Sequence, residues 1–170
     1  PESHDGFRGV KGSHMWTRRI ISDAIDLQIP LQINTTVSAW TLPGLRAMAD
    51  YVQSIPIELW AVFFLVETGR GASLEQISAA QCEEVLQFLA DLQTHVPFLI
   101  KTTEAPHFRR LSPAAARFSV NDGNGFVFID HTGAICPSGF LPMPRGNVRE
   151  GQLVDVYRHD EVFLRLRDAN

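Results

Sequence analysis

The sequence predicts an α/β fold built on a parallel sheet. Three segments with strand character, 31–37, 57–66 and 98–103, alternate with segments whose apolar residues recur at helical spacing. For the order helix, strand, helix, strand, helix, strand, right-handed parallel crossovers are the natural solution. The run from Ile57 to Val66 is almost continuously apolar, which is typical of a parallel strand covered on both faces.

The first predicted helix covers residues 13–28, with Ser13 as its cap and Pro30 as its stop. The strand that follows, 31–37, alternates with period two between an apolar and a polar face. The polar face carries Gln32, Asn34 and Thr36.

The second predicted helix begins at a Thr41 cap and runs through Val52. A glycine-containing loop, 68–73, follows the second strand. Ser78 is expected to cap the third helix, which has the clearest apolar stripe of the chain and ends before Pro97.

Beyond a connection expected at 113–117, the sequence predicts a β-hairpin over 124–137. Its strands are 126–130 and 134–136, and His131-Thr-Gly133 forms the turn. Three apolar side chains are expected to share one face of it: Phe126, Phe128 and Ile135. A short helix ending in Tyr157 follows.

The composition bounds the function. The chain has 170 residues, which suits one domain or one domain with an appendage, and 45% of them are apolar. The net charge of −4 argues against a nucleic-acid partner. The longest apolar run is too short for a bilayer, no signal peptide opens the chain, and only two cysteines are present, so a cytoplasmic location is expected. Gly12-Ser-His-Met15 looks like a cloning scar, but we interpret it as native because a motif precedes it.

Two motifs carry a family resemblance. The hairpin with its Pro-rich exit, Gly146-Asn147 and a helix ending in Tyr157 resembles the start of the SPASM or twitch region of radical S-adenosylmethionine (radical SAM) enzymes. His4-Asp5-Gly-Phe-Arg8 resembles a His-Asp-x-x-Arg segment of the same enzymes. The likeness runs from His4 to Leu166 and is greatest for proteins of alternative haem synthesis and peptide modification. It implies the second half of a (βα)6 partial TIM-type barrel over 1–112, followed by the start of a SPASM/twitch-like region over 113–170.

The resemblance also implies a cofactor site. Arg8 would bind the carboxylate of S-adenosylmethionine, because a guanidinium matches a carboxylate in bidentate fashion. Asn34 and Thr36 would face the ribose, and Glu104 the rim of the site. The loop that would border the adenine consists of Thr68, Gly69, Arg70 and Gly71.

Each of these residues also has a plainer interpretation. The segment around Asp5 could be a solvated turn whose carboxylate bonds nearby amides. The polar face of 31–37 could be that of an edge strand in water, and the glycines of 69–71 could serve only the loop backbone. Glu104 and His107 are plausible acid–base groups but unspecific ones.

The chain departs from the family pattern at the metal sites. Val120 and Ser138 stand where twitch hairpins commonly have cysteines, and Cys136 lies two positions early. We therefore expect Cys136 to be a packed thiol and assign no metal ligand in this chain. Glu67 stands where proline is expected. No Cys-x-x-x-Cys-x-x-Cys occurs here either.

S-adenosylmethionine and a [4Fe–4S] cluster are thus implied only for a full-length enzyme, which would act by a 5′-deoxyadenosyl radical on a tetrapyrrole or peptide. The chain alone is expected to be an inactive part of it, with an exposed edge at 31–37 through which it could self-associate. The alternative is a non-catalytic α/β binding or partner module. A Cys-x-x-x-Cys-x-x-Cys upstream of Pro1 would favour the enzyme.

Overall fold

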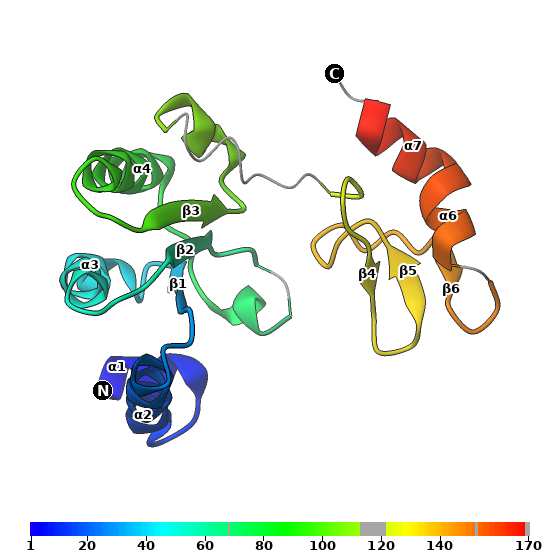
Figure 1. Ribbon diagram of the computed structural model, residues 1–170. Coiled ribbons are helices and arrows are strands. Elements are labelled where there is room, and N and C mark those ends of the chain that lie inside the picture. The colour runs from blue at the N-terminus through cyan, green and yellow to red at the C-terminus, as the bar shows by residue number, and fades with distance from the viewer. Residues whose placement is uncertain (68, 113–121, 152, 169–170) are drawn as a thin grey trace. The chain divides into compact units, whose positions relative to one another are not determined.

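The computed structural model describes residues 1–67, 69–112, 122–151 and 153–168. The chain forms two compact units, 1–118 and 119–170 (Figure 1). The connection predicted at 113–117 lies outside the described residues, so the domain boundary at 112/113 stays a prediction. No helix among the described residues is long and apolar enough to cross a bilayer.

The first unit is a mixed α/β fold around a three-stranded parallel sheet, as predicted. The strands are β1 (Gln32–Val37), β2 (Leu59–Phe64) and β3 (Leu99–Thr103), in the order β1-β2-β3. The helices are α1 (Glu2–Arg8), α2 (Ser13–Asp26), α3 (Leu45–Gln53) and α4 (Ala79–Gln93). Three 3₁₀ turns complete the unit: η1 (Leu42–Gly44), η2 (Gly69–Ser73) and η3 (Pro106–Arg110). In the described sheet β1 is an edge strand, which confirms the edge predicted at 31–37.

The strand register defines two faces of this sheet. On the first, the helix-covered face, Ile33, Trp60 and Ile100 form a row, and Trp60 and Ile100 are completely buried. The crossover helices α3 and α4 lie on the same side of the sheet (Figure 1) and contribute Ala49, Val52, Leu86 and Leu89 to this core. On the second face, the rows are Asn34–Ala61–Lys101 and Thr36–Phe63–Thr103.

The prediction that the second strand is covered on both faces is confirmed only in part by the described residues: on the second face Ala61 is 2% exposed, but its neighbours are less buried. Trp60, Val62 and Phe64 are buried in the core. Leu59 and Phe63, which point the other way, are only partly buried and lie outside the core cluster. The strand is also shorter than the apolar run that predicted it.

Two of the three predicted helix caps are also wrong. The cap residue of α2 is Gly12 rather than Ser13, which is the buried first residue of the helix. Thr41 is at the cap position of η1 rather than of α3, and its hydroxyl makes no cap bond there but donates to Thr36 O at 2.7 Å, at the end of β1. Ser78 does cap α4: its Oγ accepts the amide of Gln81, whose side chain returns a bond to the Ser78 amide.

The second unit contains the predicted hairpin. Its strands β4 (Phe128–Ile129) and β5 (Ala134–Cys136) pair antiparallel across the predicted turn. In that turn Asp130 accepts hydrogen bonds from Thr132 and from the amide of Ala134, and these lower the pKa of its carboxyl. A third strand, β6 (Gly146–Asn147), and a helix, α7 (Glu161–Asp168), were not predicted, whereas α6 (Leu153–His159) contains the expected short helix.

The shared apolar face predicted for this hairpin is wrong. Ile135 is opposite Ile129, whereas Phe128 is opposite Cys136, and directly opposed residues share a face. Phe126 and Phe128 are 38% and 42% exposed, while Ile135 is fully buried. Phe163 of α7 is also fully buried, so an element that was not predicted contributes to the core of this unit.

Candidate functional site at the carboxyl end of the sheet

The three parallel strands end at one edge of the sheet, and the segments that follow them meet there. The amide of Ala39, just after β1, donates to Glu75 O, just after η2, at 2.9 Å. The carboxyl ends of parallel strands are where α/β sheets commonly bind ligands, because loop residues from several strands lie close together there.

The turn η2 is folded tightly against the end of β2. A Cβ at Gly71 would lie 2.7 Å from Val66 O and 3.2 Å from Leu65 Cδ1, so only glycine fits. Leu65 continues the alternation of Ala61 and Phe63, which puts this turn on the side of the second face. Thr68 lies outside the described residues, and Gly69 and Arg70 form the start of the turn.

Arg8 belongs to a helix, α1, where a turn was one of the interpretations. A Cβ on Gly6 of this helix would lie 3.2 Å from Trp40 Cζ2, and Trp40 follows the carboxyl end of β1. Helix α1 therefore lies beside that end of the sheet. Arg8 is its exposed last residue, followed by Gly9 in the left-handed conformation.

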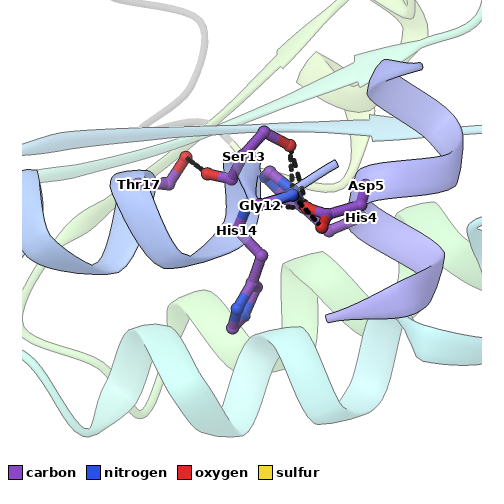
Figure 2. A network of polar contacts seen from close by, with 6 residues as sticks. All are labelled: His4, Asp5, Gly12, Ser13, His14 and Thr17. Carbon is purple, nitrogen blue, oxygen red and sulfur yellow. Dashed lines mark hydrogen bonds and ion pairs between the residues drawn. The ribbon is translucent and has the colours of Figure 1, made fainter. Parts of the chain in front are cut away.

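Asp5 joins α1 to α2 (Figure 2). Its carboxylate accepts the amide of Gly12 at 2.6 Å, the amide of His14 at 2.7 Å and the hydroxyl of Ser13 at 3.0 Å. These bonds, that from the His14 amide first, hold the pKa of Asp5 well below its usual range. The bonding of nearby amides by Asp5 is thus confirmed, and it supplies the cap that Gly12, having no side chain, cannot provide.

The polar side chains of β1 lie on the second face. Asn34 is exposed and Thr36 is half-buried, and Asn34 Oδ1 accepts a hydrogen bond from Gln32 Nε2 at 2.7 Å. Lys101, in the same row as Asn34, is half-buried. Between them Ala61 is 2% exposed.

Glu104 follows β3 directly and has a φ of 63°. A left-handed backbone is unusual for glutamate, and such outliers gather at functional sites. His107, three residues after Glu104, contacts helix α4: its Nε2 is 3.7 Å from Cys82 Sγ. Burial raises the pKa of the Cys82 thiol, so this pair is not an activated nucleophile.

The residues of the chain do not fit an iron–sulfur cluster. Cys136 is 3% exposed, and burial raises the pKa of its thiol. Ser138 Oγ, in the slot of a usual ligand, instead accepts the amides of Phe140 and Leu141 at 3.2 and 3.0 Å. The other slot, Val120, lies outside the described residues. Within the described ranges, no three His, Cys, Asp or Glu side chains are grouped so as to hold a metal.

Comparisons with known proteins agree with this architecture. The chain is 33% identical to the "AdoMet-dependent heme synthase" of Methanosarcina barkeri and 35% identical to that of Nitratidesulfovibrio vulgaris, over 98% and 97% of its length. It spans about half the length of these curated relatives, 53% and 50%. The crystal structure of Streptococcus suis SuiB bound to precursor peptide SuiA matches with a TM-score of 0.61 at 15% identity, over 94% of this chain and 40% of that one. No family model matches.

The chain is thus similar to AdoMet-dependent heme synthases along nearly its whole length, which confirms the predicted resemblance to radical SAM enzymes. The SuiB structure shares the mixed α/β fold of this chain.

Proposed function

We propose that this chain is the second half of a radical SAM barrel joined to the start of a SPASM-like region, within an enzyme that acts on a tetrapyrrole or peptide. The observation that carries the proposal is the similarity to heme synthases over 97–98% of the chain. Of the two substrate classes, the names of these relatives favour the tetrapyrrole.

The arrangement of the first unit supports a barrel. Its strands follow one another in chain order, and both crossover helices cover one face. A doubly wound sheet would reverse its strand order and place helices on both faces. In a barrel the other face lines the interior, and here that face carries Asn34, Thr36 and Lys101.

The residues at the carboxyl end suit S-adenosylmethionine. Arg8 offers a fork of donors for its carboxylate, and the amide of Asn34 can donate to one ribose hydroxyl and accept from the other. Thr36 adds a hydroxyl on the same face, and Gly71 lets η2 approach closely; Thr68, Gly69, Arg70 and Glu104 would complete the border of the site. When bound to a [4Fe–4S] cluster, S-adenosylmethionine supplies a 5′-deoxyadenosyl radical that abstracts hydrogen.

The cluster would have to be bound outside this chain, because its two cysteines are too few and are both free. The isolated chain is therefore proposed to be inactive. Free thiols suit a reducing cytoplasm, which is the location we propose. The unpaired edge of β1 is the proposed route to self-association of the chain alone.

Binding of S-adenosylmethionine by the anaerobically reconstituted full-length protein tests this function. We expect Arg8→Lys to raise the dissociation constant about tenfold or more, because lysine cannot form the bidentate pair. Arg19→Lys is the matched control, since the Arg19 side chain is 83% exposed and its ion pair in the described structure is with Asp23 of its own helix. Equal effects of the two substitutions would remove Arg8 from the site. A reconstituted protein that neither binds the cofactor nor holds iron would favour the non-catalytic module.

A further inference from the structure

The second face of the sheet carries a cation with no partner in the described structure. Lys101 is in the middle of β3 and half-buried. Among the residues that the structure describes, neither a carboxylate nor a hydrogen-bond acceptor pairs with its ammonium. The chain contains only one other lysine, Lys11, which is exposed.

Its neighbours on this face of the sheet are small or polar. In the row Asn34–Ala61–Lys101 the middle residue has only a methyl group. Since adjacent strands lie about 4.8 Å apart, the backbones of Asn34 and Lys101 stand roughly 10 Å apart. Asn34 and Lys101 thus flank a small apolar residue that is 2% exposed. The next row toward the carboxyl end adds two hydroxyls, from Thr36 and Thr103, on either side of Phe63.

This set of groups selects for one kind of ligand. A half-buried ammonium needs a negative partner, because desolvation of an unpaired charge is costly. Between the polar groups the face is apolar: Ala61 is buried, and the half-buried ring of Phe63 suits a flat or aliphatic surface. A molecule that combines an apolar body with a carboxylate satisfies both requirements.

Resting on the function proposed above, we propose that Lys101 binds a carboxylate of the substrate and so determines specificity for an acidic tetrapyrrole. Arg8 is the proposed partner of the cofactor carboxylate at the carboxyl end of the sheet. Lys101 is then the cation that can bind an anion on the second face. Lysine is a point charge with three rotatable donors, and it can follow a flexible propionate more easily than a fixed fork could.

The test compares two porphyrins that differ only in charge. Haem carries two propionates, and its dimethyl ester carries none. Binding of each to the full-length reconstituted protein is followed by absorbance titration for the wild type, Lys101→Gln and the control Lys11→Gln. We expect Lys101→Gln to weaken haem binding about 10- to 100-fold, with little change for the ester. Lys11→Gln should change neither.

A second measurement needs no variant. Acetylation of the wild-type protein, read peptide by peptide in a mass spectrometer, should show Lys101 protected by haem and not by the ester, with Lys11 labelled equally in all samples. Equal weakening of both porphyrins by Lys101→Gln, or no protection of Lys101 by haem, would overturn the role of Lys101 alone. No binding of either porphyrin by a wild-type protein that still binds S-adenosylmethionine would overturn the tetrapyrrole substrate and this inference with it.

Discussion

The distinction between the two faces of β1 can be tested by replacing neighbouring threonines. Trp60 is completely buried, and its indole N–H donates to Thr35 Oγ1 at 2.9 Å. Thr35→Val keeps the shape of the side chain and removes the only acceptor that the structure gives to this N–H. A buried donor left without a partner costs about 1–3 kcal/mol. Because Thr35 is half-buried and water could compensate in part, we expect about 1–2 kcal/mol.

The matched control is Thr36→Val. The side chain of Thr36 is on the second face, and only its backbone oxygen, which the substitution keeps, accepts the bond from Thr41. Its effect on the free energy of unfolding should stay within about 0.5 kcal/mol. The cycle is closed with Trp60→Phe: in that background Thr35→Val should cost less than about 0.5 kcal/mol, because the donor is gone.

Urea unfolding followed by circular dichroism measures the wild type and the four variants. With a urea dependence of about 1–3 kcal/mol per molar, the expected loss moves the midpoint by roughly 0.3–2 M. Faster hydrogen exchange of the Trp60 indole in Thr35→Val would identify the lost bond directly. A larger cost for Thr36→Val than for Thr35→Val would refute the assignment of the faces, and with it the placement of Asn34 and Lys101.

Further predictions concern the other unit and the start of the chain. Gly133 and Gly125 have φ values of 89° and 87°, but a Cβ would lie 2.8 Å from Asn147 Oδ1 at the first and meet nothing within 4 Å at the second. Gly125→Ala should therefore lower the stability of the second unit only by the backbone strain, about 1–2 kcal/mol, and Gly133→Ala should lower it clearly more. Hydrogen exchange of the second unit measures both effects. Alkylation of the native protein should modify half-buried Cys82 before buried Cys136. The substitution Cys136→Ser should leave the iron content of the reconstituted full-length protein unchanged. A loss of about four irons per chain would show that Cys136 is a cluster ligand. The lowered pKa of Asp5 means that its carboxylate stabilises the folded protein above about pH 4 and that this contribution is lost as the pH falls further, so the stability difference between wild type and Asp5→Asn should shrink below pH 4.

The features that the sequence predicted well are those encoded by neighbouring residues. The cap of α4 involves Ser78 and Gln81, three positions apart, and Ser78 acts as the sequence predicts. The hairpin turn depends on Asp130 and Gly133, which are likewise close in sequence. The parallel sheet followed from the alternation of elements along the chain, whereas the edge position of β1 followed from the half-barrel that the family resemblance implies.

The errors arise where the partner is distant in sequence. The cap of α2 comes from Asp5, seven residues before Gly12, so the local pattern pointed to Ser13 instead. The faces of the hairpin were misassigned because strand pairing sets which residues are opposed, and that register puts Ile135 opposite Ile129. Of the candidate site, the residue types in 31–37 gave the polar face, but Lys101 joined it only through the register of β3 against β2.

The incomplete burial of the second face of β2 bears on the function. A run as apolar as 57–66 normally lies between two layers, yet in the described residues only one layer is present, and Leu59 and Phe63 remain partly exposed on the second face. In a barrel this face is the interior, where apolar side chains of strands pack on one another or on a ligand. The polar and apolar groups on it therefore belong to one surface: Ala61 and Phe63 are its apolar part, Asn34 and Thr36 supply the hydrogen bonds, and Lys101 the charge. A sequence pattern that is too apolar for the sheet of this unit alone is thus the one expected of a strand whose second face lines a binding site.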